Sequence, residues 1–412
     1  MEQIIEQKNI TSLKRKRITY LIIGALSLLV LGLVYAWSIF ATPLGEAFGW
    51  DRSALSYTFS ISMAAFCIGA LIGSFMVKKI SIRVAILTAA ILQAGGFILT
   101  SLMAAQGIWT LYLFYGVFAG LGCGIGYNTI ISTVNLWFPE KVGFSSGILM
   151  MGYGFGSLIL GTLANAAIET FGWSATFIII GLCSACILAM LALVLRMPPK
   201  NIEEIFGKGK KKKATQTMVD YRPMIKTSVF YLFFIWAILV FAINITLVGD
   251  SKQGALALGI DPAFATLLVG LISVTNGLAR VVIGLIYDSA GLKIGLSIIT
   301  AFGVIGTGCI AGAFAFGIST PYIVGALFIG FAAGGVPVMS SSFSRERYGA
   351  KNYPKNLATV NLSVAGAAML SSLAITAGRS IGGDFEIYAI LSGVVVLAAC
   401  IILTFFRQYA KN

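Results

Sequence analysis

Residues 263–288 read AFATLLVGLISVTNGLARVVIGLIYD, and the only charged side chain before the final aspartate is that of Arg280. A helix needs about 20 predominantly apolar residues to cross a bilayer. A charge at that depth costs about 3 kcal/mol on insertion scales, so it is expected to face a polar cavity and a partner. The stretch therefore predicts a membrane span that carries an anion site.

The rest of the chain has the composition of a membrane protein. Its 412 residues are 58% hydrophobic and 11% charged, with a mean hydropathy of +0.93, which is more apolar surface than a water-soluble fold can cover. We predict an all-α polytopic fold with twelve transmembrane helices. The predicted spans are 18–42, 55–77, 84–105, 109–133, 144–168, 173–195, 228–249, 263–287, 292–316, 320–343, 357–378 and 385–406.

The basic residues gather on one side of this predicted topology. Of the 29 Lys and Arg, 25 lie in the N-terminal tail, in the loops that follow even-numbered spans, and in the C-terminal tail. Cytoplasmic loops carry such an excess, so both termini are predicted to be cytoplasmic, with the protein in the cell (inner) membrane. The net charge of +14 is spread over these loops instead of forming one basic face, so nucleic acid is not an expected partner.

A polar stretch divides the chain near its middle. Residues 197–227 contain a double proline and the run Lys210–Lys213, a composition typical of a solvated linker. The two sides repeat each other with an offset of about 210 residues, as the halves of many transporters do. The predicted domains are a six-helix half at 1–196, a cytoplasmic linker at 197–227 and a six-helix half at 228–412.

Motifs for enzymatic or ATP-driven chemistry are missing from the sequence. The chain has no His, and its six cysteines fall in apolar spans, so neither a metal site nor a nucleophile–base pair is indicated. The glycine-rich segments 120–126 and 152–156 do not follow strands as nucleotide loops do, and they favour close helix packing instead. We expect a protein that is not an enzyme, needs no cofactor and does not use ATP.

Arg280 is the candidate substrate residue. It lies about 12 Å of helix from Asp288, against roughly 15 Å for half the hydrocarbon thickness, which places it near the midplane. A guanidinium fork fits a carboxylate bidentately, with an attraction of about 4 kcal/mol at 4 Å and an effective dielectric near 20. The alternative is a structural ion pair, but no acidic residue lies well inside another span. One slim, polar helix face carries Ser273, Asn276, Gly277, Arg280 and Gly284.

The segment GLIYDSAGLK, residues 284–293, joins the eighth and ninth spans. It resembles the loop signature of the major facilitator superfamily, which implies that superfamily's fold. The resemblance also implies a conformational latch formed by Gly284, Asp288, Gly291 and Lys293. The first-half counterpart, residues 73–83, has Lys78 where the signature has Asp and Ser81 where it has Gly, so the latch is expected in the second half.

A narrower resemblance rests on GLVYAWSIF at 32–40, on NLWFPEKVG at 135–143 and on Arg280 eight residues before Asp288. These segments resemble the oxalate/formate antiporter branch, which is close to the monocarboxylate transporters. The resemblance implies secondary transport of small carboxylate anions by alternating access in the lipid bilayer, by proton-linked symport or anion exchange, with the carrier acting as a monomer. Drug efflux and a non-transporting membrane sensor are the remaining alternatives.

Further site residues are predicted in the first, fourth, fifth and eleventh spans. Tyr35, Tyr127 and Tyr153 offer phenol donors beside apolar rings and are predicted to close the site, although packing or interface anchoring would explain them equally well. Asn128 and Asn361 are predicted to orient the substrate, with helix–helix hydrogen bonding as the alternative.

The number of Lys and Arg side chains inside the predicted spans predicts the charge of the substrate. A dianion held deep in the membrane would need two of them, and the predicted eleventh span, 357–378, contains no Lys. We therefore favour monocarboxylates such as lactate or pyruvate over oxalate, with exchange of oxalate-type dicarboxylates as the alternative.

Overall fold

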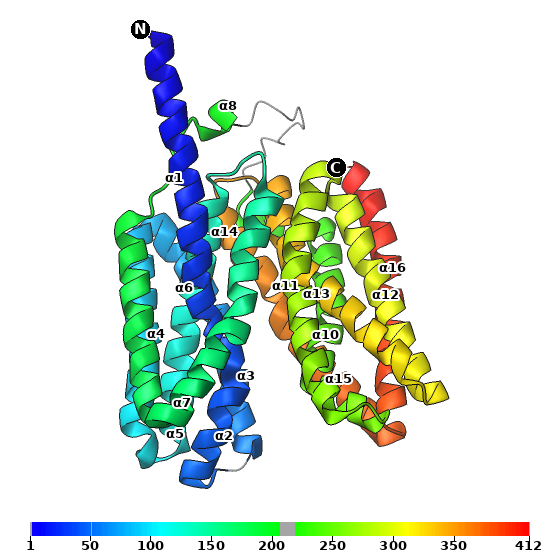
Figure 1. The fold of residues 1–412 in the computed structure, drawn as a ribbon. Coiled ribbons are helices and arrows are strands. Elements are labelled where there is room, and N and C mark those ends of the chain that lie inside the picture. The colour runs from blue at the N-terminus through cyan, green and yellow to red at the C-terminus, as the bar shows by residue number, and fades with distance from the viewer. Residues whose placement is uncertain (1, 51, 207–218, 412) are drawn as a thin grey trace. The chain divides into compact units, whose positions relative to one another are not determined.

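The computed structural model describes residues 2–50, 52–206 and 219–411, and all elements within these ranges are helical (Figure 1). A helix pairs its own backbone N–H and C=O groups, and hydrocarbon offers these groups no other hydrogen-bond partners. Among the described residues, eleven helical segments are long and apolar enough to cross a membrane. The predicted all-α, multi-span fold is confirmed, whereas the run Lys210–Lys213 lies outside the described residues.

The eleven segments accommodate the twelve predicted spans because one of them contains two. Helix α7, Val142–Val194, is 53 residues long, so a straight helix of this length would measure about 80 Å against about 30 Å of hydrocarbon. Gly172 interrupts it with φ 80° and ψ 161°, a conformation that glycine adopts without a steric penalty. The predicted spans 144–168 and 173–195 lie on the two sides of this break.

Two compact units make up the chain. Unit 1 comprises Met1–Ala214 together with Tyr353–Thr359, and unit 2 comprises Thr215–Asn352 together with Val360–Asn412. The described parts of the predicted linker contain two short helices, α8 (Ile202–Phe206) and α9 (Tyr221–Met224).

Unit 1 carries a bundle of long helices (Figure 1, blue to green). Its elements are α1 (Glu2–Leu31), the 3-10 turn η1 (Gly32–Ala36), α2 (Trp37–Phe48), α3 (Arg52–Lys79), α4 (Ile82–Met103), η2 (Ala104–Gln106), α5 (Ile108–Leu111), the π-helix η3 (Tyr112–Ala119), α6 (Gly120–Asn135), α7, α8 and most of α14 (Tyr353–Asn361).

The core of unit 1 near α2 is aromatic. Phe40 is fully buried, and its ring centroid lies 5.0 Å from that of Phe177 and 6.1 Å from that of Phe97, in both cases edge to face. Trp37 and Tyr115 extend the cluster with centroids 4.6 Å apart. Such pairs contribute beyond their buried area, so this end of unit 1 is held by ring contacts.

Elsewhere in unit 1, glycines allow helix backbones to touch. A Cβ on Gly32 would overlap the carbonyl oxygen of Tyr153, and a Cβ on Gly156 would overlap that of Leu29. Small residues at helix crossings permit this close approach in membranes. The first part of α7 therefore lies directly on α1 and η1.

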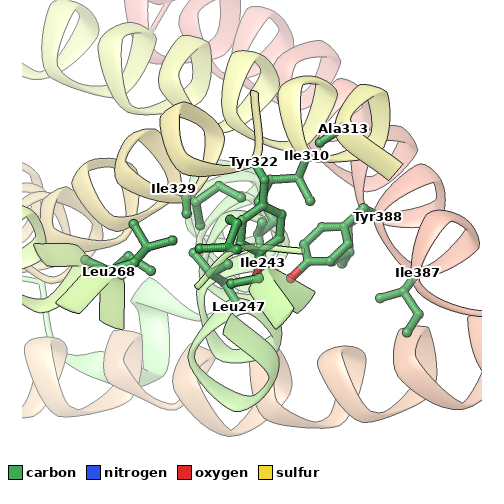
Figure 2. Packing of buried hydrophobic residues seen from close by; sticks show 14 of the residues in the cluster. Ile243, Leu247, Leu268, Ile310, Ala313, Tyr322, Ile329, Ile387 and Tyr388 are labelled. Carbon is green, nitrogen blue, oxygen red and sulfur yellow. The ribbon is translucent and has the colours of Figure 1, made fainter. Parts of the chain in front are cut away.

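Unit 2 contains the remaining elements, and one apolar core joins several of them. They are α9, α10 (Ser228–Ala257), α11 (Pro262–Ala290), α12 (Leu292–Phe316), α13 (Ser319–Tyr348), α15 (Ser363–Ile381) and α16 (Asp384–Lys411). Figure 2 shows the core, in which Ile243, Leu268, Ile310 and Tyr322 pack together. The hydroxyl of Tyr322 donates to the backbone oxygen of Ser251 at 2.8 Å, so its polar end is satisfied inside the core.

The crossing of α1 and α7 makes a prediction about stability. Gly156→Ala adds a methyl group where the carbonyl of Leu29 lies, and overpacking of this kind typically costs about 1–3 kcal/mol. Gly95→Ala is the matched control, because nothing lies within 4 Å of its Cβ position and Ala is about 1 kcal/mol better than Gly in a helix. Thermal unfolding in detergent should show a lower midpoint for Gly156→Ala and an unchanged or higher one for Gly95→Ala. Equal midpoints would contradict the described crossing.

Candidate functional site

Helix α11, which carries Arg280, has well-defined ends. Asp261 caps its start, since its carboxylate accepts hydrogen bonds from the backbone N–H groups of Ala263 and Phe264 at 2.9 and 3.1 Å. Pro262 occupies the first turn, where its missing N–H is not needed. The helix ends at Gly291, whose φ of 84° stops it. These signals place Arg280 well inside the helix.

The guanidinium of Arg280 is bound by an amide on its own helix. Its Nε and Nη2 donate to the Oδ1 of Asn276 at 3.2 and 2.9 Å, and the residue is only 9% exposed. Residues four apart share one face of a helix, so the sequence spacing produces this pair directly. Asn276 supplies an acceptor that carries no charge of its own.

The faces of α11 differ in character. Leu267, Leu278 and Leu285 are 55%, 52% and 50% exposed, as expected for side chains that would contact lipid. Arg280 lies on the covered side, with the partly buried Asn276 one turn earlier. The charged residue therefore faces protein rather than the lipid-facing surface of its helix.

Helix α13 packs against the same turns of α11 without a side chain between the two backbones. A Cβ on Gly334 would overlap the carbonyl oxygen of Asn276, and one on Gly330 would lie 2.7 Å from the Oγ1 of Thr275. This Gly-x-x-x-Gly spacing is typical of close membrane helix pairs. Pro337, one turn further on inside α13, removes a backbone donor from the helix ladder. Backbone contact thus sets the position of the Asn276 turn.

The structure brings two of the predicted tyrosines together in unit 1. The ring centroids of Tyr127 and Tyr153 are 4.7 Å apart, and Phe66 lies 5.2 Å from Tyr127. The thiol of Cys123 contacts the Tyr153 hydroxyl at 3.5 Å and donates to the backbone oxygen of Leu31 at 3.2 Å. Both tyrosines are nearly buried, so they form one aromatic cluster with polar tips.

The other predicted residues are less closely joined. Asn128 is fully buried, and its Nδ2 donates to the backbone oxygen of Pro354 at 3.1 Å, while its Oδ1 has no partner among the described residues. Asn361 is 8% exposed and its Nδ2 likewise has no partner in the described chain. Tyr35 belongs to η1, but its side chain lies outside what the structure describes.

The predicted latch residues occupy the junction of α11 and α12. Next to Asp288, the hydroxyl of Tyr287 donates to the Oε2 of Glu346 in α13 at 2.7 Å. Lys293 is exposed, with its Nζ 5.9 Å from the ring centroid of Phe406. Sequence reasoning missed Glu346 because it lies near the end of a span among basic residues. The latch stays a prediction for Gly284, Asp288, Gly291 and Lys293.

The helix of the eleventh predicted span begins earlier than the sequence indicates. The helical segment that contains the predicted span 357–378 begins four residues earlier, at Tyr353, so it includes a lysine. Lys355 is only 9% exposed, and its ammonium lies 4.2 Å from the ring centroid of Phe75. Pro354 and Lys355 lower the local hydropathy, which moved the predicted boundary past them. A proline in the first turn is a helix-start signal that could have located the true beginning.

A sequence profile described as the Major Facilitator Superfamily matches residues 21–254, more than half of the chain. The chain belongs to this superfamily. It is therefore a multi-pass membrane transporter and not an enzyme, as the sequence predicts.

Curated relatives of this superfamily member include carriers named for carboxylates. It is 27% identical over 300 residues to an oxalate:formate antiporter of Oxalobacter formigenes, which spans 71% of this chain and 68% of that protein. It is also 29% identical over 194 residues to monocarboxylate transporter 12 of Rattus norvegicus, spanning 46% of this chain and 39% of the relative. The resemblance predicted from the sequence motifs is confirmed.

Solved structures agree on the fold. The proton:xylose symporter XylE, bound to 6-bromo-6-deoxy-D-glucose, aligns with a TM-score of 0.75 at 17% identity and covers 95% of this chain and 96% of its own. FucP in the outward conformation aligns with a TM-score of 0.71 at 13% identity, covering 95% and 99%. At such identities the likeness concerns the fold alone.

Proposed function

We propose that this transporter is a secondary carrier of small monocarboxylate anions, such as lactate or pyruvate, and that Arg280 binds the carboxylate. The observation that carries the proposal is a guanidinium 9% exposed inside α11 and oriented by the Oδ1 of Asn276. A charge at membrane depth marks a functional site by default. A planar fork of donors suits a carboxylate better than any neutral ligand.

The relatives support this ligand class. These relatives are named for oxalate, formate and monocarboxylates. All of these anions present a carboxylate to the protein. Carriers with such ligands work either by exchanging one anion for another or by moving the anion with a proton. We propose alternating access by one of these two modes, in the cell membrane, with both termini cytoplasmic and the monomer as the working unit.

The remaining predicted residues are assigned supporting roles. Tyr127 and Tyr153, joined at 4.7 Å, offer phenols beside apolar rings, a combination that suits a short organic acid. Tyr35 is assigned the same role. Asn128 and Asn361 each retain an amide atom without a partner in the described chain, and such atoms suit ligand recognition, because leaving them unsatisfied is costly.

A dicarboxylate is the second candidate substrate, and one observation favours it. Lys355 is a second buried cation, at the start of the helical segment Tyr353–Ile381, and a dianion needs more than one positive charge to offset its desolvation. The ammonium already lies on the face of Phe75, a contact that stabilises it without an anion. For this reason the monocarboxylate remains the first candidate.

The first functional prediction concerns Arg280→Lys. An ammonium cannot reproduce the bidentate fork, and a lost hydrogen bond to a charged group costs about 1.5–3 kcal/mol. Uptake of labelled lactate or pyruvate into proteoliposomes should fall by about tenfold or more at equal amounts of inserted protein. Arg222→Lys, an exposed position outside the spans, is the matched control. Wild-type uptake by Arg280→Lys would rule out the assigned role.

The second functional prediction concerns substrate charge. Unlabelled lactate and pyruvate should displace labelled substrate at lower concentrations than oxalate does. If oxalate competes better, Lys355→Gln should remove that advantage, since it keeps a polar side chain, one atom shorter, and loses the charge. Better competition by oxalate that survives Lys355→Gln would contradict both the preference for monocarboxylates and the role of Lys355 in binding a dicarboxylate.

The third functional prediction concerns coupling. The chain has no His, and Asn276 stands where an acid could have paired with Arg280. We expect uptake to be driven by an outward gradient of a second carboxylate, with any proton dependence set by the substrate and Arg280. The measurement compares counterflow from preloaded vesicles with uptake under a pH gradient at zero membrane potential. Strong pH-driven accumulation without counterflow, abolished by neutralising Asp250, Asp261, Asp288 or Glu346, would instead identify a dedicated proton carrier.

A further inference from the structure

We propose that Cys123 is a positioning residue for the substrate. Its sulfur accepts the hydrogen bond of the Tyr153 hydroxyl while the carrier is empty, and the hydroxyl turns to the carboxylate when the anion binds. The phenol keeps its proton throughout, and only the acceptor changes. The proposal rests on the substrate role proposed above for Tyr153. Cys123 acts through that tyrosine and does not itself touch the anion.

The direction of the two hydrogen bonds at Cys123 follows from the protons available. The sulfur lies 3.2 Å from the backbone oxygen of Leu31 and 3.5 Å from the hydroxyl oxygen of Tyr153. A carbonyl oxygen can only accept, so the single thiol proton is donated to Leu31. Toward Tyr153 the sulfur is therefore the acceptor, and the phenol is the donor.

This hydrogen bond is protected from water but weak. Cys123 is fully buried and Tyr153 is 3% exposed, so water has little access to it. Sulfur is a poor acceptor, whereas a carboxylate forms charge-assisted hydrogen bonds about twice as strong as those between neutral groups. An anion that reaches the phenol is thus expected to take the donor from the sulfur. The sulfur loses little, because it accepts weakly.

The rest of Tyr153 is held in place, so the direction of its O–H bond is the main freedom left. Its backbone carbonyl lies where a Cβ on Gly32 would be, and its ring packs on that of Tyr127 with centroids 4.7 Å apart. Gly32 follows Leu31, at the point where α1 ends and η1 begins. The backbone of Tyr153 contacts this junction directly, and its hydroxyl is tied to the same junction through Cys123.

The first test follows the S–H stretching band of the purified carrier by infrared spectroscopy, with the native cysteines present. The difference from Cys123→Ala identifies the band of Cys123. Hydrogen bonds in a chain strengthen one another, so loss of the phenol donor in Tyr153→Phe should weaken the bond to Leu31 and raise the S–H frequency. An unchanged band in Tyr153→Phe would overturn the proposal.

Tyr127→Phe is the matched control for this band. Its ring packs on Tyr153, but the hydrogen bonds of Cys123 within the described chain go to Leu31 and Tyr153. The frequency should therefore stay at the wild-type value. An equal shift in both variants would show that the band reports packing of the rings, and would also overturn the proposal.

Pyruvate should move the same band in the wild-type protein. If the phenol turns to the carboxylate, saturating pyruvate should raise the S–H frequency as Tyr153→Phe does, and it should have no further effect in Tyr153→Phe. A carrier that transports pyruvate without any change in this band would contradict the release of the hydroxyl from sulfur.

The second test compares two substitutions of Cys123 in pyruvate counterflow, at equal amounts of inserted protein. A hydroxyl accepts more strongly than sulfur, so Cys123→Ser should retain the phenol and raise the KM by about three- to tenfold. Cys123→Ala offers no acceptor and should leave the KM equal to the wild-type value or lower.

A role in packing alone predicts the reverse order. Buried cysteine packs like a small hydrophobic residue, so the near-isosteric serine would be mild, and alanine, which leaves a cavity, would be the more damaging substitution. A KM for Cys123→Ser that is no higher than that for Cys123→Ala would overturn the proposal.

Wild-type counterflow decides the proposed function separately. If the wild-type carrier moves no carboxylate, the proposed function fails and the release of the Tyr153 hydroxyl to a carboxylate fails with it. If the carrier transports pyruvate and the two Cys123 variants share one KM, only the role of Cys123 fails.

Discussion

Hydrocarbon cannot form hydrogen bonds, so polar groups of this chain at membrane depth have to find their partners inside the protein. Arg280 finds the amide of Asn276 one turn away. Trp236 donates its indole N–H to the Oγ1 of Thr300 at 2.9 Å. Asn135 uses both atoms of its amide. Each of these bonds specifies a neighbour, and together they restrict how the helices can be arranged within each unit.

Glycine contacts tie the scaffold to the candidate site. In unit 1, Gly32 packs on the backbone of Tyr153, and in unit 2, Gly334 packs on the backbone of Asn276. Both partners are candidate site residues. Because a backbone contact leaves less freedom than a contact through a long side chain, the crossing of two helices positions the site residue directly. Substitution of either glycine is thus expected to disturb the site as well as the packing.

Sequence reasoning succeeded where the relevant partners are close along the chain. The spacing of Asn276 and Arg280 on one helix face implied the pair that the structure contains. Sequence reasoning placed the eleventh span four residues after the helix begins at Tyr353, because the proline and lysine at the start of α14 lower the local hydropathy. The hydrogen bond between Asn135 and Tyr353 was missed, since residues 218 positions apart have no local signal that links them.

The sequence by itself determined the all-helical class, the membrane location, the buried arginine and the superfamily, because each depends on composition, helix periodicity or a short motif. The tertiary structure decided that Tyr127 and Tyr153 meet, that α13 lies directly on the Asn276 turn, and that the first turns of α14 are bound to unit 1. The physical reason is range. Hydrophobic length and helix spacing are local properties, whereas side-chain hydrogen bonds and backbone crossings depend on which helices pack together, and many packings are compatible with the same set of apolar spans.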